Sequence, residues 1–209
     1  MSGFTEGRVI FDRYIDNSLK AQTHVKRSAG VDPVKFNIKD STNIKLVPLE
    51  TLLSHTDTKS QLTQYLCRAL LHEYADSSES VVVVYGTSTY SNKADVFNHN
   101  IGEHSHEETD TLIPMHVLDA FKTDRAIRDI DVYSSDTDVF IFLMDLFATN
   151  NIRGNLHFIT GKGTEKCKID IKARCLAVGS ERSKGLLGLH ALLVQIGEEH
   201  LQVYQKVGG

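Results

Sequence analysis

Apolar residues recur along this chain with two periods, which predict strands and helices in alternation. Short runs rich in β-branched residues predict strands at residues 9–11, 80–85, 130–133, 155–160 and 167–171. Segments in which apolar residues return every three or four positions predict helices at residues 58–74, 106–121, 136–146, 173–178 and 181–193. This alternation predicts an α/β fold with a mostly parallel sheet covered by helices on both faces.

Polar and turn-forming residues mark where these elements end. Residues 13–48 and 86–105 lack an apolar period and predict loops. Thr58 is the predicted N-cap of the first helix, and either Ser135 or Asp136 that of the third. Pro114 falls inside the second helix, which predicts a short or kinked first turn.

Composition describes an ordinary folded protein. The chain has 209 residues, 41% of them hydrophobic and 24% charged, which suffices for one α/β domain with a sizeable core. Its longest apolar runs are far too short to span a membrane. The N-terminus lacks the apolar stretch of a signal peptide, and three widely spaced cysteines fit neither a disulfide framework nor a zinc site. We therefore expect an intracellular protein, nuclear or cytoplasmic, that is not secreted and has no membrane partner.

Charge is distributed unevenly along the chain. Residues 95–145 carry twelve acidic and three basic residues, whereas residues 161–185 carry seven basic and three acidic ones. Residues 19–47 are also basic, with six bases and two acids. Such asymmetry suits an acidic metal centre flanked by segments that face phosphates, although solvated faces also distribute charge unevenly.

Five carboxylates follow or begin predicted elements, and they are the strongest functional signal. Asp12 follows the first strand, Glu108 and Asp110 lie at the start of a helix, and Asp136 and Asp138 follow the strand at 130–133. Each motif alone has a simpler explanation, because acids near a helix N-terminus stabilise it by about 0.3–1 kcal/mol. Together they suggest an oxygen-only site for Mg²⁺ or Mn²⁺ at the carboxyl edge of the sheet.

Three other motifs have simpler explanations. His99, His104 and His106 lack a matching distal ligand pair, so we interpret them as solvated loop residues. The Gly161-Lys162-Gly163 sequence lacks the P-loop pattern, and a tight hairpin turn explains it. His190 lies in an apolar helix, where a packing role is the default.

The order and spacing of these motifs resemble a PIN-like nuclease domain. The resemblance is carried by the sequences Val-Ile-Phe-Asp12-Arg-Tyr, Glu107-Glu108-Thr-Asp110-Thr, Ser-Ser-Asp136-Thr-Asp138-Val and Gly185-Leu-Leu-Gly188-Leu-His190-Ala-Leu. More narrowly, the chain is similar to flap-endonuclease-like domains of transposon-associated animal proteins. The resemblance covers residues 1–193 and leaves residues 194–209 as a divergent tail.

The resemblance implies a three-layer α/β/α Rossmann-like core and one or two bound Mg²⁺ or Mn²⁺ ions. Asp12, Glu108, Asp110, Asp136 and Asp138 match the family's metal ligands, which serve hydrolysis of DNA or RNA phosphodiesters. The basic residues after Asp12 fall where relatives contact the nucleic-acid backbone; they are Lys20, Lys26 and Arg27.

Two departures from the family pattern change the expected activity. The chain starts after the family's first, central strand, and Ile196 stands where relatives supply a last acidic ligand. We therefore expect impaired cleavage, and a protein that needs a partner, self-associates or is a fragment of a longer product. Two alternatives stay open: a non-catalytic interaction module of the same fold, and a Mn²⁺-dependent nucleotide-sugar transferase that uses only Asp136 and Asp138.

Overall fold

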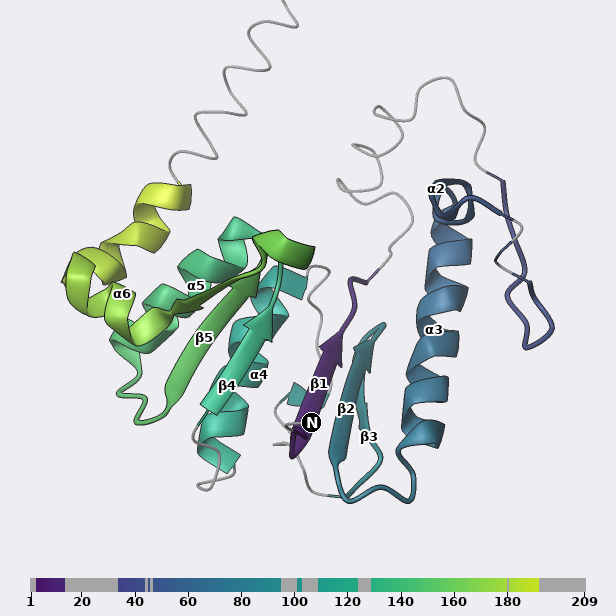
Figure 1. The fold of residues 1–209 in the computed structure, drawn as a ribbon, viewed down its shortest axis with the longest axis horizontal. Helices are drawn as coiled ribbons and strands as arrows, with labels where there is room; N and C mark the ends of the chain where they lie inside the picture. The colour runs from purple at the N-terminus through teal and green to yellow at the C-terminus, as the bar shows by residue number, and fades with distance from the viewer. Residues whose placement is uncertain are drawn as a thin grey trace, which may run out of the picture. The chain divides into compact units, whose positions relative to one another are not determined.

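The structure is a computed structural model, and it confirms the α/β class (Figure 1). It describes residues 3–13, 34–43, 45, 47–94, 101–102, 109–123, 129–179 and 181–191. The chain divides into two compact units, Met1–Leu112 and Ile113–Gly209, and each contains a three-stranded sheet. No helix in the part that the structure describes is long and apolar enough to cross a membrane.

The first unit is built on a sheet with the strand order β1-β2-β3. The strands are β1 (Glu6–Ile10), β2 (Ser80–Tyr85) and β3 (Ser88–Ser91). β1 pairs parallel with β2, and β2 turns back antiparallel into β3 through Gly86, whose φ of 64° suits glycine. β3 lies inside the stretch 86–105 that the sequence pattern predicts to be loop, so that prediction is wrong for residues 88–91.

β2 is the core strand of this unit. Its four consecutive valines, residues 81–84, are each at most 3% exposed, as expected of a strand covered on both faces. Val81 and Val83 pack with Cys67 of α3 (Thr56–Glu73), which is preceded by the short helix α2 (Leu49–Leu52). The apolar face of α3 therefore covers one side of the sheet.

The start of α3 differs from the predicted one. Its N-cap is His55, whose Nδ1 accepts a hydrogen bond from the Asp57 backbone N–H at 3.1 Å. Thr58, the predicted cap, lies in the first turn, where its hydroxyl accepts from the Phe36 N–H at 2.9 Å. Thr58 is fully buried by this contact, which ties the segment 34–43 to the helix.

The second unit repeats the same strand pattern. β4 (Asp129–Tyr133) pairs parallel with β5 (Asn155–Thr160), which pairs antiparallel with β6 (Cys167–Asp170). The hairpin predicted around residues 161–163 is confirmed. Because each sheet joins one parallel and one antiparallel pair, a mostly parallel sheet is not confirmed among the described strands.

Helices cover one face of this second sheet. They are α5 (Thr137–Thr149), α6 (Ile171–Val178), a helix over residues 181–191, and α4 (Thr109–Thr123), which crosses the boundary between the units. Val132, Leu143, Leu156 and Ile171 form the centre of the core, each at most 7% exposed. α4 continues past Pro114, so the predicted helix forms in spite of the proline.

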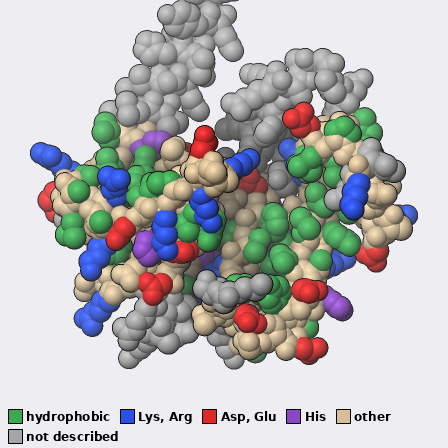
Figure 2. All heavy atoms as spheres, viewed as in Figure 1, with side chains coloured by type: hydrophobic (Ala, Val, Ile, Leu, Met, Phe, Trp, Pro, Cys, Tyr) green, Lys and Arg blue, Asp and Glu red, His purple; other side chains and the backbone are tan. Residues whose placement is uncertain are grey.

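Strand alternation leaves the opposite face of β4 polar. Ile130 and Val132 face the core, whereas Asp129, Asp131 and Tyr133 are exposed. Figure 2 shows charged side chains of both signs on the visible surface. On the polar face of the second sheet, Lys168 of β6 and Asp131 of β4 form an ion pair.

Candidate functional site

Asp12 links the end of β1 to the start of α4. The strand pairing continues to Phe11, whose N–H donates to the Val84 carbonyl at 3.1 Å. The next residue, Asp12, accepts at Oδ1 from the Thr109 backbone N–H at 2.9 Å and also from the Thr109 hydroxyl. These contacts join residues 97 positions apart and place Asp12 against the first turn of α4.

Asp110, a second predicted ligand, immediately follows the residue that Asp12 contacts. It lies in the first turn of α4, and its Oδ1 accepts from the Thr111 N–H at 2.9 Å. The structure therefore brings Asp12 and the Asp110 segment together within the first unit, as the edge argument predicts. Glu108 lies outside the described residues.

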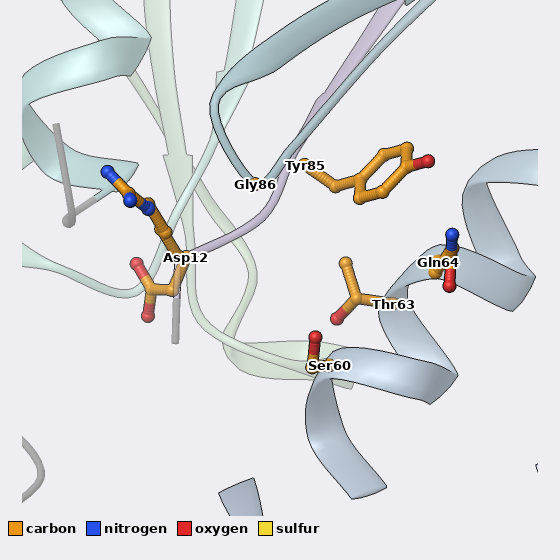
Figure 3. A pocket seen from close by; sticks show the side chains of 7 residues that line it. Asp12, Ser60, Thr63, Gln64, Tyr85 and Gly86 are labelled. Atoms are coloured by element: carbon orange, nitrogen blue, oxygen red, sulfur yellow. The ribbon is translucent and has the colours of Figure 1, made fainter. Parts of the chain in front are cut away.

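A small polar hollow of about 240 Å³ opens beside Asp12 (Figure 3). Asp12 lies at the carboxyl end of β1, Tyr85 at that of β2, and Thr63 across from them on α3. The lining is completed by Arg13, Ser60, Gln64 and Gly86. A hollow at the carboxyl edge of parallel strands is where α/β sheets place ligands.

The second pair of predicted ligands starts α5. Asp136 is the N-cap, as one of the two predicted alternatives, and its Oδ1 accepts from the Asp138 N–H at 2.9 Å. The Asp136 N–H in turn donates to the Ser134 hydroxyl at 3.0 Å. Asp136 is exposed, so its carboxylate is accessible from solvent.

Asp138 has a partner that the sequence reasoning missed. The Nε2 of His190 lies 2.9 Å from Asp138 Oδ1, and the two side chains are 22% and 37% exposed. His190 belongs to the helix at 181–191, where the apolar surroundings predicted a packing role. A histidine within an apolar helical pattern could have indicated a polar contact, but nothing in the sequence identified Asp138 as its partner.

Ionic contacts also order the polar face of the second sheet. Burial opposes ionisation of Asp131, but Lys168 and His157 outweigh it, so the pKa of Asp131 lies below its usual value. Lys168 Nζ is 2.8 Å from Asp131 Oδ1, and His157 Nδ1 is 3.0 Å from the same oxygen. This network occupies Asp131, which makes it a poor candidate for a ligand.

Four of the five predicted ligands lie in the described residues, two in each unit. Asp12 and Asp110 belong to the first unit, and Asp136 and Asp138 belong to the second. Within the described ranges, no three His, Cys, Asp or Glu side chains gather closely enough to hold a metal ion. The donors are all carboxylate oxygens, which are the ligands that Mg²⁺ and Mn²⁺ prefer. The predicted metal centre stays a prediction.

The predicted nucleic-acid contacts cannot be placed in this fold, because Lys20, Lys26 and Arg27 lie outside the described residues, as does the tail at 194–209. No family model, no curated protein and no solved structure matches the chain. The functional interpretation therefore rests on the residues and contacts described above.

Proposed function

We propose that this chain is a PIN-like, flap-endonuclease-like domain that binds Mg²⁺ or Mn²⁺ and a DNA or RNA strand. Its ligands are Asp12, Glu108, Asp110, Asp136 and Asp138. The proposal includes a three-layer α/β/α Rossmann-like arrangement with a mostly parallel sheet. In such an arrangement, ligands bind beyond the carboxyl ends of the strands.

The contact between Asp12 and Thr109 is the observation that carries this proposal. It holds a carboxylate at the end of a parallel strand against a helix start that carries another acid, Asp110. Hydrogen bonds that fix a carboxylate reduce the entropy lost when it binds a cation. In the second unit, the hydrogen bond from the Asp138 backbone N–H fixes the Asp136 carboxylate in the same way.

Divalent ions in such centres activate a water molecule and stabilise the leaving oxygen of the phosphodiester. The residues of this chain would hold the carboxylates in place and carry the charge that attracts the ions. Because the family's last acidic ligand is replaced by Ile196, we propose weak cleavage or none.

Calorimetric titration with Mn²⁺ tests the metal site. The comparison is between the wild type and the double variant Asp136→Asn/Asp138→Asn. Asparagine caps a helix as well as aspartate, so the double variant keeps the cap of α5. It loses both charges and, with them, the ionic contact between Asp138 and His190. Asp145→Asn is the matched control, because Asp145 lies on the same helix two turns later.

Saturable Mn²⁺ binding by the wild type and by Asp145→Asn, but not by the double variant, is the expected result. A folded wild type that binds no Mn²⁺ would overturn the proposed metal site. Rapid Mn²⁺-dependent cleavage of single strands, flaps or hairpins would instead show that the domain is fully active.

The non-catalytic interaction module is the second candidate, and the capping role of Asp136 favours it. A carboxylate that caps a helix has a structural reason to be there without any metal. Under this alternative the same titration shows no Mn²⁺ binding, and Asp136→Asn leaves the urea midpoint unchanged or slightly raised because charge repulsion is relieved.

A further inference from the structure

The turn between β5 and β6 is closed so tightly that one of its positions requires glycine. Gly161 has φ +81°, and a Cβ built on it would lie 2.3 Å from the Glu165 backbone oxygen. The next residues form the 3₁₀ helix η3 (Gly163–Glu165), closed by a hydrogen bond of 3.0 Å from Glu165 N–H to the Lys162 carbonyl. The turn therefore holds the backbone of Lys162 and Lys166 in fixed positions.

This turn lies at the same edge of the sheet as the exposed ring of Tyr133. β4 and β5 run parallel, with Tyr133 opposite Ile159, so the end of β4 and the turn after β5 share the carboxyl edge. The Lys166 Nζ lies 4.9 Å from the centre of the Tyr133 ring. Tyr133 is nevertheless 64% exposed, which leaves much of the ring open to solvent.

The acidic pair follows directly after this ring in the chain. Tyr133 ends β4, the N–H of the next residue, Ser134, donates to the Ile159 carbonyl at 3.1 Å, and Asp136 begins α5. An exposed aromatic ring, two lysines and a pair of carboxylates therefore lie at one edge of one sheet. Among the described residues, none of the four other strands ends in this combination.

Charged side chains on the adjacent face of the sheet have partners within the protein, whereas the lysines of the turn between β5 and β6 form no ion pair within the part of the chain that the structure describes. Asp131 pairs with Lys168, and Asp170 caps α6 by accepting from the Ala173 N–H at 2.9 Å. The side chain of Lys162 has no ion pair with a described residue, and the turn's one acid is the exposed Glu165. A flexible polyanion would meet two lysines here without displacing an existing ion pair.

We propose that Tyr133 is a stacking platform for one base of a single-stranded nucleic acid, with Lys162 and Lys166 contacting its phosphates. Single strands expose the faces of their bases to aromatic side chains, whereas a duplex hides them. The inference rests on the proposed function for its choice of ligand, and it adds the form of the substrate.

The absence of tryptophan from the sequence allows a direct test. Tyr133→Trp introduces a single indole, whose fluorescence is quenched when a base stacks on it. Tyr90→Trp is the matched control, because Tyr90 is also a surface tyrosine on a strand, 41% exposed, in the first unit. Both variants are titrated with a dT oligonucleotide in EDTA, so that stacking is measured without any bound metal.

Saturable quenching in Tyr133→Trp but not in Tyr90→Trp is the expected result. In fluorescence anisotropy with a labelled dT oligonucleotide, Tyr133→Ala should weaken binding about tenfold or more, and Tyr133→Phe should keep it. Lys162→Gln/Lys166→Gln should reduce the slope of log affinity against log salt by about 1.4. Lys184→Gln, which removes a helix lysine paired with Glu181, should change this slope less.

Equal quenching in both tryptophan variants, or none in either, would overturn the platform. The metal and the platform fail independently in this design. Loss of Mn²⁺ binding with quenching intact would remove the proposed nuclease chemistry and leave a strand-binding site. Mn²⁺ binding without quenching would remove the platform alone.

Discussion

Replacing Gly161 by alanine should destabilise the second unit far more than the same change at Gly163. Both glycines have positive φ, 81° and 56°, a conformation that costs an L-residue about 1–2 kcal/mol. Only at Gly161 does the new methyl group meet an obstacle, the Glu165 backbone oxygen at 2.3 Å; at Gly163 nothing lies within 4 Å.

The magnitude follows from these two contributions. Forcing an extra methyl into a closed space costs about 1–3 kcal/mol, so Gly161→Ala loses about 2–5 kcal/mol in the folded state. Both variants regain about 0.4–1 kcal/mol because alanine restricts the unfolded chain. We expect a net loss of about 1–5 kcal/mol for Gly161→Ala and about 0–1.5 kcal/mol for Gly163→Ala, a difference of about 1–3 kcal/mol.

Urea unfolding followed by circular dichroism measures the difference. With a slope of about 1–3 kcal/mol per molar urea, a gap of about 2 kcal/mol separates the two midpoints by roughly 1 M. Midpoints for the two variants that agree within error would refute the close approach of Gly161 to Glu165. Gly161→Ala should also lower the affinity for a dT oligonucleotide, because the turn that carries the two lysines would change shape.

Three further predictions concern titrating and buried groups. The pKa of Asp131 lies below its ordinary value of 3.8, so the stability that its ionised form contributes is present above that value and is lost as pH falls through the lower pKa of the folded state. The urea midpoint of the wild type should therefore fall below about pH 4, and Lys168→Gln should make this fall smaller. Burial raises the pKa of Cys67 to about 11, so iodoacetamide at pH 8, read by peptide mass spectrometry, should modify exposed Cys167 and leave Cys67 unmodified until urea unfolds the chain. Asn92→Ala should lower the free energy of unfolding by about 2–4 kcal/mol. The Asn92 side chain accepts from the Val81 N–H at 2.7 Å and donates to the carbonyls of Tyr74 and Glu79. A loss of less than about 0.5 kcal/mol in urea unfolding would contradict this role.

Periodicity located five of the six described strands and missed β3. The run of valines in β2 and the alternation in β4 gave boundaries that agree with the structure to within one residue. β3 was missed because Ser88-Thr89-Tyr90-Ser91 has little apolar signal and forms only by pairing with β2. The antiparallel pairings of β3 and β6 are the reason that a mostly parallel sheet is not confirmed among the described strands.

The candidate site was predictable where local sequence decides the geometry. Asp136 caps α5 because an aspartate between a strand and an apolar helical run is a strong N-cap signal. The contact between Asp12 and Thr109 was anticipated only as a shared edge, and the pairing of His190 with Asp138 was not anticipated. Contacts between distant residues depend on strand register and on packing, and neither can be predicted from the periodicity of a single sequence.

The capping and metal-binding interpretations of these acids are compatible. A carboxylate has two oxygens and about four acceptor positions. Asp136 accepts one hydrogen bond at Oδ1 from the helix start and Asp12 accepts two at Oδ1, so the Oδ2 atom of each is not used by these contacts. A helix N-terminus also carries about half a positive charge, which repels a cation. A divalent ion will therefore bind beside such a helix only if carboxylates outnumber the caps that the helix needs. Asp110 in the first turn of α4 and Asp138 in that of α5 are additional to the carboxylates that accept from the helix start, Asp12 and Asp136. This excess over capping is what the proposed metal site requires.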